Sequence, residues 1–211
     1  MGKKIIAIVL VIAGLLAIAV GVFLVFNKDS DTKNEGATKQ QGESTMNKDD
    51  KAIVVYFSAQ NHTRNVATKI AANVGADIFE IEPVQAYTED DLSWTDSESR
   101  VSREHNDESL QTIDLKSTTV PNWDEYKTVY IGYPIWWGGS AWPVDSFVKK
   151  VDFGDKTVIP FCTSHSSGLG TSDTDLKAKA TGGNWQPGHR FSQDATDAEI
   201  KTWTDSLWVS S

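Results

Sequence analysis

The 211-residue sequence contains a single cysteine, Cys162. An intrachain disulfide and a cysteine-based zinc site are therefore excluded. Two nucleotide-binding motifs are also missing. Without G-x-x-x-x-G-K-[ST], nucleoside triphosphate hydrolysis would lack its lysine, and no G-x-G-x-x-G motif follows the first predicted strand. G-x-S-x-G is absent as well, so the adjacent pair Ser164 and His165 does not indicate a hydrolase.

Basic residues are scarce in most of the chain. Residues 1–48 hold six of the 20 basic and four of the 29 acidic residues, which leaves residues 49–211 with 14 basic and 25 acidic residues, a net charge of −11. Binding to a phosphate backbone needs a basic face, so nucleic acid is not an expected partner of this region. The histidines show no spacing typical of a metal site, and no metal is expected.

Residues 5–26 form an uncharged, almost wholly apolar run of 22 residues. As a helix this run would be about 33 Å long, close to the roughly 30 Å hydrocarbon core of a bilayer. We therefore predict a transmembrane anchor in residues 1–26. A cleaved signal peptide is the alternative, but its apolar region usually has about 7–15 residues and ends at a small-x-small site, whereas this run ends in Val-Phe-Leu-Val-Phe.

Residues 27–50 mix charged residues with Ser, Thr, Gln and Gly, and almost none of them is apolar. Such a segment cannot bury enough surface to offset its ordering entropy, so a disordered linker is predicted there. The short basic amino terminus, with Lys3 and Lys4, favours the cytoplasmic side of the membrane. The prediction is a single-pass protein of the cell membrane whose domain, residues 51–211, lies outside the cytoplasm.

From residue 51 onward, apolar runs typical of buried strands alternate with stretches of helical periodicity. Strands separated by helices pair in parallel, which predicts an α/β domain with a doubly wound sheet and helices on both faces. Function in such sheets collects beyond the carboxyl ends of the strands. The predicted strands are residues 52–57, 77–82, 128–133, 157–162 and 188–192, the predicted helices are residues 66–74, 142–150, 173–180 and 198–209, and the loops at the carboxyl edge are residues 58–63, 134–140 and 163–172.

The first loop, Ser-Ala-Gln-Asn-His-Thr at residues 58–63, leads from a strand directly into a helix. Its hydroxyl and amide groups lie with unpaired N–H groups at the positive end of a helix dipole, which suits a single phosphate. Asn61 adopts the positive φ that such a turn needs more readily than most residues. The alternative is that Asn61 or Thr63 only caps the helix.

The second loop, Pro-Ile-Trp-Trp-Gly-Gly-Ser at residues 134–140, places two tryptophans beside glycines, an arrangement that can stack a flat ring. The alternative is that Trp136 or Trp137 fills the core under the next helix, and we expect this of one of the two. The third loop, residues 163–172, is rich in hydroxyl groups and offers several backbone N–H groups to the edge of a polar ring.

Together, the three loops resemble the flavodoxin family, in the branch that carries a Pro-Ile-Trp-Trp-Gly loop. Residues 55–63, 131–138 and 161–170 carry the resemblance, which covers about residues 51–208. It implies a five-stranded parallel sheet in flavodoxin order, 2-1-3-4-5, that binds FMN noncovalently. The family's first loop usually reads Ser/Thr-x-Thr-Gly-Asn-Thr, so Ser58 and Thr63 match, while Gln60, Asn61 and His62 replace Thr, Gly and Asn.

The resemblance also implies which residues hold the cofactor, although it assigns no catalytic residue. The first loop would bind the phosphate of FMN, the second loop would pack against one face of the ring, and the third loop would line the edge of the ring. In chain order these residues are Ser58, Gln60, Asn61, His62 and Thr63, then Pro134, Ile135, Trp136, Trp137 and Gly138, then Thr163, Ser164, His165, Gly168 and Gly170.

The resulting functional prediction is a membrane-tethered, FMN-binding electron carrier that exchanges electrons with a reductase and an acceptor protein. An FMN-dependent NAD(P)H quinone reductase or other small-substrate reductase is the alternative, because residues 85–114 form a segment long enough to build a substrate wall. The opposing interpretation is that residues 87–115 form a solvated helix with no further role. A third alternative is a noncatalytic binding module that has kept the fold and lost the flavin.

Overall fold

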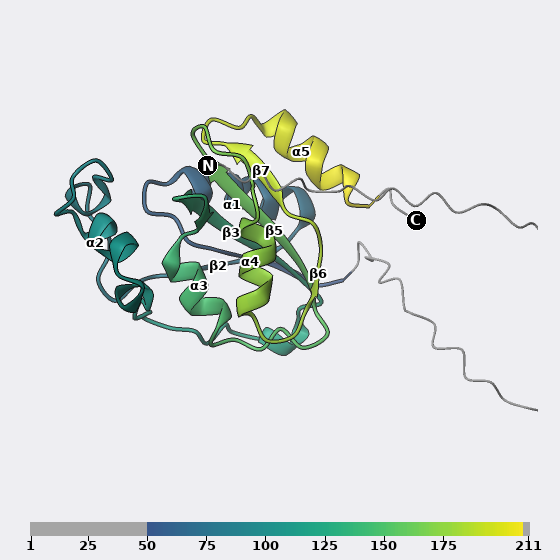
Figure 1. The fold of residues 1–211 in the computed structure, drawn as a ribbon. Coiled ribbons are helices and arrows are strands. Elements are labelled where there is room, and N and C mark those ends of the chain that lie inside the picture. Colours follow the sequence, from purple (N-terminus) through teal and green to yellow (C-terminus); the bar gives the residue numbers. More distant parts are fainter. Residues whose placement is uncertain (1–49, 209–211) are drawn as a thin grey trace, which may run out of the picture. The chain divides into compact units, whose positions relative to one another are not determined.

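A seven-stranded sheet forms the centre of residues 50–208, the part of the chain that the computed structural model describes (Figure 1). The strand order is β2-β1-β3-β5-β6, with β4 paired to β3 and β7 paired to β5, and every pairing except that of β4 is parallel. The predicted α/β fold with a parallel sheet is confirmed. The strands are β1 (Ala52–Tyr56), β2 (Asp77–Glu80), β3 (Thr128–Trp136), β4 (Gly139–Ser140), β5 (Thr157–Ser164), β6 (Asn184–Trp185) and β7 (His189–Ser192).

The predicted count of five strands is too low, for two reasons. The last position of the sheet is divided between β6 and β7. Residues 186–188 lie between them, where β5 has only two residues, so the pairing is interrupted there. Pro187 also has no N–H to donate to β5. The other addition is β4, which turns back antiparallel on the end of β3. If β6 and β7 are taken as one interrupted strand, the parallel positions follow the predicted order.

Helices cover both faces of the sheet (Figure 1). The predicted helices are present with shifted ends, and residues 85–114 contain one further short α-helix and two 3-10 helices. The α-helices are α1 (His62–Val74), α2 (Arg100–Asn106), α3 (Trp142–Val148), α4 (Ser172–Lys179) and α5 (Asp197–Ser206), and the 3-10 helices are η1 (Asp90–Leu92), η2 (Glu108–Gln111) and η3 (Trp123–Glu125).

The core has two halves, one on each side of the sheet, because successive strand residues point to opposite faces. In β1, Ile53 and Val55 pack with α3 and α4, whereas Val54 and Tyr56 pack with α1 and α5. Cys162 is fully buried in the first half, and burial raises the pKa of its thiol to about 12. The thiol therefore stays protonated near neutral pH and does not act as a nucleophile.

The predicted membrane anchor, residues 1–26, and all but the last residue of the predicted linker, 27–50, lie outside the described residues. Within residues 50–208, none of the helices is both long and apolar enough to cross a bilayer.

Candidate functional site at the carboxyl edge of the sheet

The first loop leaves the amino end of α1 open. Asn61 occupies the N-cap position with a φ of 64°, the left-handed conformation expected of it, but its side chain makes no capping bond. Instead, Asn61 Oδ1 accepts a hydrogen bond from Arg64 Nη1 at 2.8 Å. The capping alternative is thus correct for the position of Asn61 and wrong for its side chain. The first N–H groups of a helix have no intrahelical partners, so this end can receive an anion.

Ser58 adds an unused hydrogen-bonding group to the same loop. Its Oγ atom is buried and has no hydrogen-bond partner among the described residues, a state shared only with the hydroxyl of Tyr130 in the core under α1 and α5. An unsatisfied buried hydroxyl costs about 1–3 kcal/mol. Because Ser58 lies in the loop before the amino end of α1, its hydroxyl can donate a hydrogen bond to a ligand bound there.

Thr63 joins the first loop to the third. Its Oγ1 lies 2.8 Å from Oγ1 of Thr163, the two residues being 1% and 2% exposed. Arg64 does not supply a free positive charge beside them, because its guanidinium donates to Asn61, to the Tyr56 hydroxyl and to Glu80, with which it forms an ion pair. An anion at this loop would be held by N–H groups, hydroxyls and the helix dipole.

The second predicted loop is mostly strand. Residues 134–136 continue β3, and Ile135 and Trp136 pair with Ser140 and Gly139 of β4. The remaining turn is Trp137–Gly138, with φ values of 46° and 83°. A two-residue hairpin turn with positive φ at both positions usually carries Asn-Gly, so a tryptophan here strains the backbone. Backbone strain of this kind is usually retained in a protein where the strained residue has a function, which makes Trp137 a candidate site residue.

The two tryptophans have different environments. Trp136 is half-buried and packs edge-on against Phe57, Tyr87 and Trp142, with ring centroids 5.1–5.7 Å apart, so it is the one of the pair that packs against the core. Trp137 is 42% exposed. Its ring stacks on His105, with centroids 4.4 Å apart and planes 11° apart. His105 is itself exposed, so the stacked pair lies at the surface.

The third loop is tied to the last strand position. Arg190 of β7 donates to the hydroxyl of Ser164 at 3.1 Å, to its carbonyl at 2.9 Å and to the carbonyl of His165 at 3.3 Å. Gly170 has a φ of 57°, and a Cβ on it would lie 3.8 Å from the carbonyl of Gly138. The second and third loops therefore approach each other.

A cavity of about 530 Å³ lies between the loops. Eight predicted residues line it: Gln60, Pro134, Ile135, Trp136, Trp137, Thr163, Ser164 and His165. The lining does not include Ser58, Asn61, His62, Thr63, Gly138, Gly168 or Gly170. It adds Ser166 and Ser167 from the third loop, Leu92, Trp94 and Val101 from the segment 85–114, and Gln193, none of which was singled out as a cofactor-binding residue. None of the lining residues is Asp, Glu, Lys or Arg, so the cavity suits a flat, uncharged ring.

Residues 85–114 supply Leu92, Trp94 and Val101 to the cavity lining. The two ends of this segment are held together by backbone hydrogen bonds. Val84 N donates to Asp114 O, and Lys116 N donates to Glu82 O, both at 2.8 Å, on either side of a bridge between Pro83 and Leu115. The interpretation of this segment as only a solvated helix is wrong, because Val101 and Ile113 pack with Trp142 in a small core of their own.

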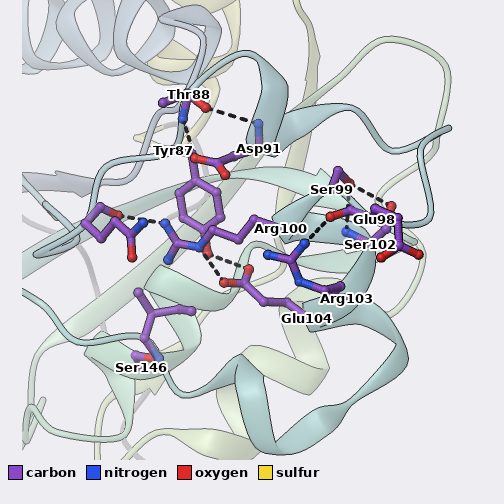
Figure 2. Close-up of polar contacts among 12 residues, drawn as sticks. Tyr87, Thr88, Asp91, Glu98, Ser99, Arg100, Ser102, Arg103, Glu104 and Ser146 are labelled. Carbon is purple, nitrogen blue, oxygen red and sulfur yellow. Dashed lines mark hydrogen bonds and ion pairs between the residues drawn. The ribbon is translucent and has the colours of Figure 1, made fainter.

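A polar network stiffens the same segment (Figure 2). The Arg100 guanidinium lies 3.8 Å from the ring centre of Tyr87 and donates to Glu104 at 2.7 Å. The Tyr87 hydroxyl donates to Glu104 at 2.7 Å, and both burial and this bond raise the pKa of Tyr87. Because the Tyr87 ring also touches Trp136, the network supports one wall of the cavity.

Fold and site together define a flavodoxin-like α/β protein, with an open helix end and an aromatic cavity where the parallel strands end. The chain belongs to the flavodoxin family, whose model matches residues 51–207. Among curated proteins, the search found no match.

Solved structures agree with this assignment. One from Bacteroides eggerthii, assigned as a flavoprotein, is 38% identical with a TM-score of 0.67, and the match covers 75% of this chain and 98% of that chain. One from Bacteroides uniformis, with the same assignment, is 37% identical with a TM-score of 0.68 and covers 74% and 97%. Those two chains consist almost wholly of the matched region.

A more distant structure is that of a Lactobacillus acidophilus flavoprotein in complex with FMN. It is 19% identical with a TM-score of 0.56, over 74% of this chain and 99% of that chain. At this identity the comparison establishes a shared fold.

Proposed function

We propose that this chain is an FMN-binding electron-transfer protein, tethered to the cell membrane by a helix in residues 5–26. FMN supplies one- and two-electron chemistry when bound, and the protein sets its position and surroundings. The observation that carries the proposal is an uncharged aromatic cavity beside the open end of α1, where the buried Ser58 hydroxyl has no hydrogen-bond partner within residues 50–208. The FMN complex of the Lactobacillus acidophilus protein, which has the same fold, supports this choice of ligand.

The residues divide between the two ends of the ligand. The first loop, through Ser58, Gln60, Asn61, His62 and Thr63, would hold the phosphate. Residues 134–138 would lie against the ring, and Thr163, Ser164, His165, Gly168 and Gly170 would line its edge. With no lysine or arginine in the cavity lining, negative charge on the ring would receive no cationic partner there.

The isolated domain tests FMN binding directly. Residues 49–211, purified from an expression host, should be yellow and should lose that colour when dithionite is added, because reduction removes the visible absorbance of the ring. An absorbance spectrum before and after reduction makes the measurement. A colourless domain that also fails to bind added FMN would contradict the proposal and favour a binding module without flavin.

Membrane tethering needs a separate experiment. The full chain should sediment with membranes and resist a carbonate wash, since a span of 22 apolar residues partitions into the bilayer, whereas residues 49–211 should stay in the supernatant. Protease added to intact spheroplasts should digest the domain if it lies outside the cytoplasm. A full chain released without detergent would overturn the tether, and complete protection from protease would reverse the orientation.

The small-substrate reductase remains the second candidate, and one observation favours it. Residues 85–114 line the cavity with Leu92, Trp94 and Val101, so they form a wall of the kind that a small substrate would require. Steady NADPH consumption by the FMN-loaded domain in the presence of a quinone would distinguish this candidate from a carrier that needs a partner protein.

A further inference from the structure

Trp137 combines a strained backbone with an aromatic neighbour from a distant part of the chain. It occupies the turn between β3 and β4 with a φ of 46°, a conformation that is unfavourable for a bulky side chain. Its ring stacks on that of His105, with centroids 4.4 Å apart and planes 11° apart. Strain of this kind costs about as much as one aromatic pair contributes, so the stack can hold the turn in this conformation.

Helix α2 fixes the position of His105. Ser99 caps this helix by accepting a hydrogen bond from the N–H of Ser102 (Figure 2). One turn later, Glu104 is only 5% exposed and accepts a hydrogen bond from the Arg100 guanidinium at 2.7 Å. A ring in the last turn of an ordered helix loses little further backbone entropy when it stacks.

The same side of α2 makes a second contact beside the turn. Val101 and His105 are four residues apart, so they lie on one side of the helix. Val101 packs with the buried Trp142, and the ring of Trp142 is stacked against Trp137, with centroids 5.9 Å apart and planes 21° apart. Two successive turns of α2 therefore face the aromatic residues of the hairpin region.

The base of the hairpin is held by separate contacts. Ser140 of β4 is buried, and its hydroxyl donates to Asp145 of α3 at 2.5 Å. Asp145 is also buried and forms an ion pair with Lys179 of α4 at 2.6 Å. These bonds fix the base of the hairpin, whereas its tip is held by the aromatic contacts of Trp137.

His105 acts on the cavity only through Trp137. Trp137 belongs to the lining of the cavity between the loops, and His105 does not. A residue in this position influences affinity by preorganisation, because the apparent Kd rises as fewer molecules hold the conformation that binds the ligand.

We propose that His105 is a positioning residue for the flavin ring, whose stack holds the strained Trp137–Gly138 turn in the conformation that binds FMN. This inference rests on the proposed FMN function. It adds a residue outside the three loops, from the segment 85–114, that determines affinity at the ring end of the site.

The stack is tested by NMR on the ligand-free full chain in detergent micelles, with 13C-labelled histidine. The sequence has four histidines, and His105→Gln assigns the resonances of His105 by their loss. Because its ring protons lie over the indole, the ring current should shift them upfield. Trp137→Gly removes the indole and suits a positive φ, so it should abolish the shift. Resonances that do not respond to this substitution would overturn the inference.

Affinity is measured on the same full chain by fluorescence titration with FMN and with riboflavin. His105→Ala should raise both Kd values by a similar factor, about two- to tenfold, as expected for the loss of one aromatic pair. The Tm should change by less than about 2 °C, because His105 is exposed and Ala is the better helix former.

Two further substitutions separate stacking from other roles of the side chain. His105→Phe keeps a flat ring and should restore both Kd values to within about twofold of the wild type, whereas His105→Gln, polar without a ring, should behave like His105→Ala. Asn106→Ala is the matched control. Asn106 is also exposed and is the next residue of α2 but carries no ring, so its removal should leave both Kd values unchanged.

Four affinity results would overturn the inference while FMN binding stands. They are Kd values insensitive to His105→Ala, a loss confined to FMN, a loss in His105→Phe as large as in His105→Ala, and a Tm that falls together with the affinity. The last would make His105 a structural residue of its segment. A chain that shows the stack by NMR and yet binds neither FMN nor riboflavin would instead reject the proposed function, and the inference with it.

Discussion

Ser58→Ala is expected to weaken FMN binding about 10- to 100-fold, because a hydrogen bond to a charged phosphate contributes about 1.5–3 kcal/mol. The same substitution should stabilise the ligand-free domain, since it removes a buried hydroxyl that has no partner in the part of the chain that the structure describes. A gain of about 1 kcal/mol corresponds to a rise of roughly 2–4 °C in Tm for a domain of this size. Fluorescence titration with FMN and thermal unfolding of the ligand-free domain measure the two effects.

Riboflavin provides the internal control, because it has the ring without the phosphate. Its affinity should be unaffected by Ser58→Ala. Ser97→Ala, at an exposed serine of the 85–114 segment, should change neither binding nor stability. Equal losses of FMN and riboflavin affinity, or a lower Tm for the ligand-free variant, would show that Ser58 acts through the fold and not on the phosphate.

Gly132→Ala is expected to destabilise the domain by about 3 kcal/mol, the upper end of the range for an overpacked core. A Cβ at Gly132 would lie 2.2 Å from Cζ of Phe161 and within 3 Å of two more ring atoms. Phe161 is fully buried between β3, Phe191 and Trp203, so its ring has little room to move. The Tm should fall by roughly 6–12 °C, measured by thermal or denaturant unfolding.

Two further variants separate this clash from a general effect of losing glycine. Gly139→Ala adds a Cβ whose nearest neighbour is the carbonyl of Trp136 at 3.8 Å, so it should be nearly neutral. Adding Phe161→Leu to Gly132→Ala should make the double variant less destabilised than the sum of the two single variants, because the shorter side chain relieves the contact. Strictly additive losses would exclude the steric explanation.

The elements that could be predicted are those with a strong local pattern. Apolar runs gave the strands that become β1, β3 and β5, and polar loops at their ends drew attention to Ser58, Thr63 and Thr163. Each lies where parallel topology requires, and the Thr63–Thr163 bond joins two of the loops directly. Whether these residues bind FMN is a prediction that awaits the titration.

The parts that could not be predicted depend on contacts distant in sequence. Residues 85–114 have no sustained periodicity, and their fold depends on the Arg100–Glu104 pair, on Tyr87 and on packing against Trp142. The length of this segment suggested a wall, but no local pattern marks Trp94 as one of the residues that line the cavity. The hairpin at Trp137 escapes prediction because a tryptophan with positive φ runs against the usual turn signals.

The hydroxyl pair formed by Thr63 and Thr163 has a directional consequence. Each hydroxyl carries one proton, so only one of them can donate across the 2.8 Å that separates them. If a ligand oxygen near α1 takes the Thr63 proton, Thr163 must donate to Thr63, and its proton is then withheld from anything beyond β5. A ligand oxygen bound to the Thr63 hydroxyl therefore determines that Thr163 donates to Thr63, so that toward the cavity the Thr163 hydroxyl can only accept a hydrogen bond. The change needs only a rotation of the two hydroxyl groups.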